Sequence, residues 1–156
     1  MKSPKPASRS ARELEAFLHE KIPLTQAMEI RVPENSALRV VVEAPLTANI
    51  NHLGTAFGGS LHALPTLAGY GLVWTLLQEA GLCEGHVVLK SSRASYREPV
   101  RGRLRAVCVR PPAAVVAEFL ANVRRHKKAR MELAAIVEGE GDQPAVEFHG
   151  MFVAVG

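Results

Sequence analysis

The sequence predicts an α+β domain in which an antiparallel sheet of five to six strands wraps around one long central helix. Residues 44–78 contain no Asp, Glu, Lys or Arg, which is typical of a helix buried on all sides. Segments with the two-residue alternation of strands lie before and after this stretch. The later strands follow one another without helical crossovers, so we expect them to run antiparallel.

The elements before the central helix are predicted from caps and turn residues. An amphipathic helix is expected over residues 10–20, with Ser10 as its cap and Pro23 ending it. Strands are expected at residues 28–32 and 38–44, joined by a turn over residues 33–36.

The elements after the central helix complete the sheet. The helix is expected to end near Gly81, and strands are expected at residues 87–96, 104–110, 129–138 and 145–155. Pro111 and Pro112 start a short helix between two of these strands, with an apolar stripe of Val116, Phe119, Leu120 and Val123. This order is the hotdog architecture. One sheet on one helix leaves apolar surface at its edge, so we expect a homodimer that extends the sheet, and a homotetramer if dimers pair again.

Composition limits the remaining classes of protein. The 156 residues fit one domain over residues 12–156 behind a flexible basic tail over residues 1–11. A net charge of +4 favours anionic partners, but aromatic residues are only 5% of the chain, which argues against nucleic-acid binding. Residues 61–77 are too short and too polar for a membrane span. Two cysteines without metal-ligand spacing indicate a cytoplasmic protein with no metal.

The uncharged stretch opens with a glycine-rich motif. Residues 49–61 read Asn-Ile-Asn-His-Leu-Gly-Thr-Ala-Phe-Gly-Gly-Ser-Leu, with Ile-Pro-Leu at residues 22–24, Ala-Pro-Leu at 44–46 and Tyr-x-x-Pro-Val at 96–100. This set resembles the thioesterase domain that some bacteria carry fused behind an acetyltransferase domain. It is also similar to the phenylacetyl-CoA thioesterase-like branch of the hotdog superfamily.

The resemblance implies hydrolysis of an acyl thioester at sites shared between two subunits. The acyl group would be carried on coenzyme A or on the phosphopantetheine of an acyl carrier protein, and no other cofactor is expected. The residues support this chemistry independently. Gly58 and Gly59 permit close backbone approach, and unpaired amides at a helix start direct partial positive charge toward a carbonyl. The alternative is that the two glycines only let the helix enter the sheet tightly.

The acid that the resemblance implies is missing. In the phenylacetyl-CoA thioesterase-like branch a catalytic carboxylate lies seven residues after the second glycine, and here that position is Thr66; Phe57 replaces the usual His. Our hypothesis is that Asn51 and Thr66 orient the water or the thioester and that His62 accepts a proton. His62 can equally be an interior or interface histidine, and the Thr66 hydroxyl can bond back to the carbonyl of His62.

The candidates for substrate recognition come from several segments of the chain. Ser91 and Arg93 share a strand face and are candidates for a phosphate, although an exposed strand face explains them as well. The basic run at residues 124–128, with Arg130, is either a solvated turn or a site for an anionic carrier. Pro65 either widens the pocket or is a tolerated kink. Catalytic candidates are Asn51, Gly59, His62 and Thr66, and binding candidates are His52, Thr55, Phe57, Gly58, Ser60, Ser91 and Arg93.

Two rival functions stay open. The missing acid is compatible with a hotdog protein that binds acyl thioesters without cleaving them. A dehydratase or hydratase of the same fold is a second rival, but it needs a histidine together with a carboxylate. Apolar side chains at Phe57, Leu61, Tyr70 and Trp74 suggest a fatty or aryl acyl group, although they also fit an ordinary core.

Overall fold

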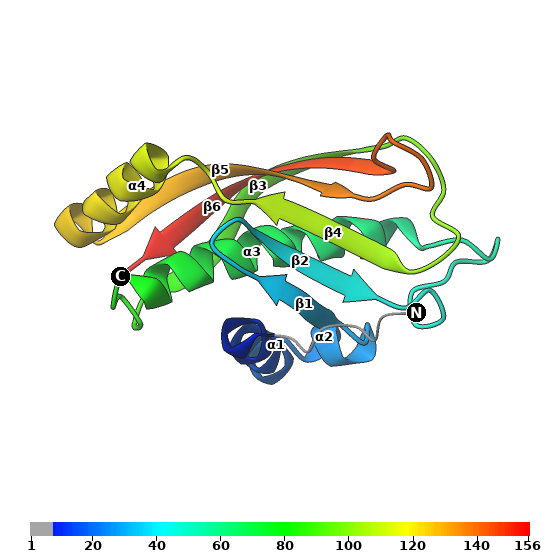
Figure 1. Ribbon diagram of the computed structural model, residues 1–156, viewed down its shortest axis with the longest axis horizontal. Helices are drawn as coiled ribbons and strands as arrows, with labels where there is room; N and C mark the ends of the chain where they lie inside the picture. Colours follow the sequence, from blue (N-terminus) through cyan, green and yellow to red (C-terminus); the bar gives the residue numbers. More distant parts are fainter. Residues whose placement is uncertain (1–7) are drawn as a thin grey trace.

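A computed structural model describes residues 8–156 as one six-stranded antiparallel sheet around the long helix α3 (Figure 1). The strand order is β1-β2-β4-β5-β6-β3. The elements are α1 Arg9–Lys21, α2 Pro23–Ala27, β1 Arg31–Asn35, β2 Arg39–Ala44, α3 Gly58–Glu79, β3 His86–Tyr96, β4 Leu104–Val109, α4 Ala113–His126, β5 Lys128–Val137 and β6 Val146–Val155. The predicted hotdog fold is confirmed, with six strands.

Helix α3 supplies most of the core. Its side chains at Leu64, Ala68, Leu72 and Leu76 are at most 1% exposed and belong to one cluster with the inner face of the sheet. A helix of 22 residues is about 33 Å long, so it crosses the whole domain. Pro65 lies inside the helix and is buried. No helix in the described part of the chain has the length and apolar character needed to cross a bilayer.

The sequence predicts that α3 is buried on all sides, and this prediction is wrong for the single chain. Gly58 and Gly59 are exposed, and Ala63, Thr66 and Tyr70 are only half-buried. The sheet covers one side and α1 packs on another, where Leu14 contacts Gly71. A flank of mostly small side chains is therefore left open.

The elements before α3 begin and end at other residues than predicted. Ser8, not Ser10, caps α1 through a 3.3 Å bond from the amide of Ala11. Helix α1 therefore starts inside the predicted tail; residues 1–7 lie outside the described part, so the tail stays a prediction there. Pro23 begins α2 instead of only ending α1, since proline fits a first helical turn.

Strand β1 is displaced toward the carboxyl end because it includes the predicted turn. Pro33 lies within it, and the pairing with β2 shifts register between Arg31 and Glu34. Strand β1 is at the edge of the sheet, where a residue without an amide hydrogen is tolerated. A sequence pattern cannot show that the strand is an edge strand.

Helix α4 fills a space beside β5. Strands β4 and β5 pair only through Ala106↔Val137 and Val107↔Ile136, so most of β5 has no strand on that side. Helix α4 packs there, and the buried Phe119 and Val123 of its predicted apolar stripe join the core.

Helix α3 approaches the sheet closely at Gly69. A Cβ at this position would lie 2.6 Å from the ring of Phe152, which is itself fully buried. Alanine is favoured over glycine by about 1 kcal/mol in a helix interior, whereas overpacking costs about 1–3 kcal/mol. We expect Gly69→Ala to lower the midpoint of thermal unfolding, measured by circular dichroism. A raised midpoint would show that Phe152 can move aside.

Candidate functional site

The glycine-rich loop is held in place by two asparagines of the motif. Asn49 is buried and donates from Nδ2 to the carbonyls of Met28, at 3.0 Å, and Pro45, at 2.8 Å. Asn51 Oδ1 accepts from the amides of Leu53, at 2.8 Å, and Thr55, at 3.1 Å. Asn51 Nδ2 donates to Thr55 Oγ1 at 2.8 Å. The polar groups of Asn51 and Thr55 therefore form the hydrogen bonds that close the loop.

The chain from the loop into α3 leaves three amides without a partner. Ala56 donates to the carbonyl of Val100 at 2.8 Å, and Phe57 donates to that of Asn49 at 2.7 Å. The next bonded amide is that of Leu61, which donates to Phe57. Within residues 8–156, no hydrogen bond uses the amides at 58–60, and no side chain caps the helix. These groups carry the positive end of the helix dipole.

The two glycines differ in what surrounds them. A Cβ at Gly59 would lie 2.4 Å from Cε1 of Phe57, so glycine here allows the Phe57 ring to lie against the first turn. A Cβ at Gly58 would meet nothing within 4 Å. Gly59 thus has a packing role within the chain, whereas Gly58 faces open space.

A polar cluster lies one turn further along α3. His62 Nε2 is 3.0 Å from Ser92 Oγ, and His62 Nδ1 is 3.4 Å from the hydroxyl of Tyr96. The imidazole also meets the edge of Phe148, with ring centroids 5.4 Å apart. His62 is half-buried, while Ser92 and Tyr96 are exposed. The cluster holds the imidazole at both nitrogens and leaves it within reach of solvent.

Sequence reasoning missed Ser92 because of a β-bulge. The pairing of β3 with β6 shifts register between Leu89 and Ser91. Simple alternation groups Val87 and Leu89 with Ser91 and Arg93, but the bulge turns Ser92 inward, toward α3. Ser91, Ser92 and Arg93 all line a cavity to which α3 contributes no residue, but of the three only Ser92 also contacts His62. In one chain Ser91 and Arg93 are not brought to the helix start.

Sequence reasoning also missed the contacts that the Tyr-x-x-Pro-Val segment makes with the site. Tyr96 reaches His62, and the carbonyl of Val100 holds Ala56 directly before the free amides. The segment therefore joins the end of β3 to the start of α3. Its residues were identified as part of a motif, but spacing along the chain could not show which groups they contact.

The remaining candidates are placed as follows. Thr66 Oγ1 donates to the carbonyl of His62 at 2.8 Å, the alternative that the sequence had left open. His52 is exposed and Ser60 is half-buried. Tyr70 and Trp74 stack on Phe17 of α1, with centroids 6.4 and 4.6 Å apart, so they belong to the α1 contact.

Tyr70 and Cys108 do not replace the missing acid, because burial keeps both groups neutral. Burial raises the pKa of Tyr70, which keeps its phenol protonated. Burial also raises the pKa of Cys108 to about 12, so its thiol stays neutral. Cys83 is exposed but follows the carboxyl end of α3, at the far end of the helix from Gly58.

A family model and several solved structures resemble this chain. A family model described as "Putative thioesterase (yiiD_Cterm)" matches residues 11–156. A protein of unknown function from Chlorobaculum tepidum superposes with a TM-score of 0.89 at 29% identity, covering 93% of each chain. A "putative thioesterase" from Shewanella oneidensis gives 0.82 at 28% identity, covering 94% of this chain and 98% of its own. A phenylacetic acid degradation protein from Thermus thermophilus, 22% identical with a TM-score of 0.58, covering 86% of this chain and 99% of its own, shares the fold.

The role of Asn51 in the loop can be tested by hydrogen exchange. We expect Asn51→Ala to accelerate amide exchange at Leu53 and Thr55 by about fivefold, since each lost hydrogen bond contributes about 1 kcal/mol. His52→Ala is the matched control, because His52 is an exposed neighbour in the same loop. Equal exchange rates in the two variants would contradict a structural role for Asn51.

Proposed function

We propose that this chain, which belongs to the thioesterase family that it matches over residues 11–156, hydrolyses acyl thioesters at the start of α3. One observation carries the proposal. Three unpaired main-chain amides at residues 58–60 lie one helical turn before a histidine whose two ring nitrogens face hydroxyl groups. Amides that can receive an oxyanion and an imidazole that can receive a proton are the two requirements of thioester hydrolysis.

The amides act on the thioester oxygen. When water attacks the carbonyl carbon, negative charge develops on this oxygen. Donors at the helix start that are already oriented stabilise that charge without reorganising. Each well-placed donor contributes about 3 kcal/mol to the transition state. The carbonyl would enter from the side of Gly58, where the backbone faces open space.

His62 takes the place of the missing carboxylate. One ring nitrogen accepts the proton of the attacking water, and the same proton then passes to the departing thiolate, so the reaction releases an acid and a thiol. The hydroxyls of Ser92 and Tyr96 fix the orientation of the ring, and the attacking water would replace the longer contact, that of Tyr96 with Nδ1 at 3.4 Å. In this mechanism Asn51 and Thr66 maintain the scaffold, since their polar groups are bonded within it.

The substrate class follows from the open side of the site. Phe57 is 57% exposed beside the free amides and offers an apolar surface to an acyl group. We propose an acyl group carried on coenzyme A or on a carrier protein.

A binding protein without hydrolysis is the second candidate. It is favoured by the lack of any Asp or Glu in α3 before Glu79, at the other end of the helix. The same lack counts against a dehydratase or hydratase. A panel of short, long and aryl acyl-CoA substrates distinguishes a thioesterase from a binding protein. A thioesterase releases a free thiol, whereas a binding protein binds the substrates without releasing one.

We also propose that two chains form the working unit. Within residues 8–156, strand β3 pairs only with β6, so the other edge of this eleven-residue strand has no partner there. Leu89 and Tyr96 on its inner side are 37% and 52% exposed. A strand edge of this length presents unpaired backbone groups that can pair with a second copy of the chain. The open flank of α3, with Ala63 and Thr66, lies on the same side of the sheet and would meet the partner helix.

Replacement of His62 tests the mechanism. We expect His62→Ala to lower kcat for thiol release by about 10² or more, the range of general-base catalysis, and Ser92→Ala and Tyr96→Phe to lower it by smaller factors. Ser95→Ala is the control, since Ser95 lies on the same strand but faces away from α3. Unchanged kcat in His62→Ala would remove the histidine from the reaction.

A charge on the flank of α3 tests the dimer. We expect the native chain to sediment at the mass of two chains or of four, and Ala63→Glu to sediment as a monomer, because the partner helix would bury an unpaired carboxylate. Ala121→Glu on the exposed side of α4 is the control. A native monomer would contradict the proposed assembly.

A further inference from the structure

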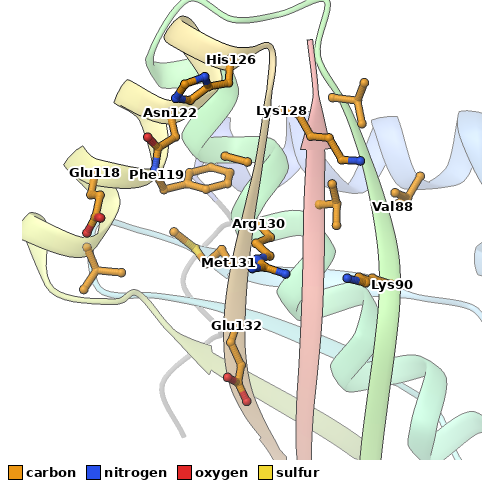
Figure 2. A pocket seen from close by; sticks show the side chains of 14 residues that line it. Val88, Lys90, Glu118, Phe119, Asn122, His126, Lys128, Arg130, Met131 and Glu132 are labelled. Carbon is orange, nitrogen blue, oxygen red and sulfur yellow. The ribbon is translucent and has the colours of Figure 1, made fainter.

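A groove of about 1120 Å³ lies on the face of the sheet turned away from α3 (Figure 2). Its floor is the outer side of β5, β6 and β3, and one wall is α4. The free amides at residues 58–60 and His62 are on the opposite face. The groove is therefore separate from the site proposed above.

Part of the groove is apolar although water reaches it. Val88 on β3, Val155 on β6 and Val115 on α4 are 52%, 40% and 46% exposed. Val153 and Phe119 line the deeper part. Apolar side chains that gather in a concave surface favour an apolar ligand.

Three cations surround this apolar floor without acidic partners. Lys128 and Arg130 extend from β5 and Lys90 from β3, and Figure 2 shows Arg130 and Lys90 reaching toward each other from either side of β6. No ion pair within 4 Å joins any of the three to an acid in the described part of the chain. Arg97 and Arg105, by contrast, are each paired. Converging unpaired cations create a positive potential that attracts an anion.

We propose that this groove binds a medium-chain carboxylate, with the alkyl chain on the valines and the carboxylate between Arg130 and Lys90. Two acids, Glu118 and Glu132, also line the groove, so the three cations leave a single net positive charge. This balance suits a monoanion and disfavours a nucleotide with several phosphates. The wall from Val115 to His126 is about 16 Å long, enough for a medium-length alkyl chain. The inference does not depend on the proposed function.

The test is a titration of ¹⁵N-labelled protein with dodecanoate, followed by amide chemical shifts. We expect shifts at Val88, Ala129 and Val153. Arg130→Gln is expected to weaken binding about fivefold, and Lys90→Gln/Arg130→Gln about tenfold or more. Lys21→Gln, an exposed cation on α1, is the control and should bind like the native chain. Dodecyl trimethylammonium should not produce the shifts, and dodecyl phosphate should bind no tighter than dodecanoate.

Three results would overturn the inference. Shifts confined to residues 51–62 would place the acid at the thioester site alone. Equal binding of the cationic amphiphile, or an unchanged Kd in the double variant, would show that the cations do not recognise the carboxylate. Markedly tighter binding of dodecyl phosphate would make the groove a phosphate site instead.

Discussion

Burial of a long helix without charge is the constraint on which this structure depends. Helix α3 has no ionisable acid or base other than His62 and Tyr70 until Glu79, and most of its surface cannot remain in water without losing the hydrophobic contribution to stability. A sheet that curves around the helix is the way in which this chain covers it. Because α1 and the sheet do not cover every side, one flank of α3 stays open next to the free edge of β3.

The missing cap of α3 is the reason why the helix start is the proposed reactive position. A helix end leaves its first amides unpaired, and a polar side chain usually caps them. Here the cap position is Phe57, which has no group to offer, and the nearby polar side chains of Asn49 and Asn51 are bonded elsewhere. Hydrogen bonds from the side chains of Asn49 and Asn51 and from the amides of Ala56 and Phe57 close the loop, and three consecutive unpaired amides follow at residues 58–60.

Catalysis in this proposal depends on groups far apart along the chain. His62 comes from α3, whereas Ser92 and Tyr96 come from β3, thirty and thirty-four positions later. They meet because β3 lies beside the amino-terminal half of α3 and because its bulge turns Ser92 inward. In the proposed mechanism, a histidine that two hydroxyls orient takes the place of the missing carboxylate.

The sequence by itself determined the fold class, the central helix, a sheet of five to six strands and the position of the glycine-rich loop, because these follow from local periodicity, caps and turn residues. It also showed that no acid lies in the helix between the glycines and Glu79. Only the tertiary structure decided that Asn51 closes its own loop, that Thr66 bonds back to its helix and that Ser92, not Ser91, faces His62. A bulge, an edge position and a hydrogen bond between distant strands are set by how segments pack together, and no local pattern records that packing.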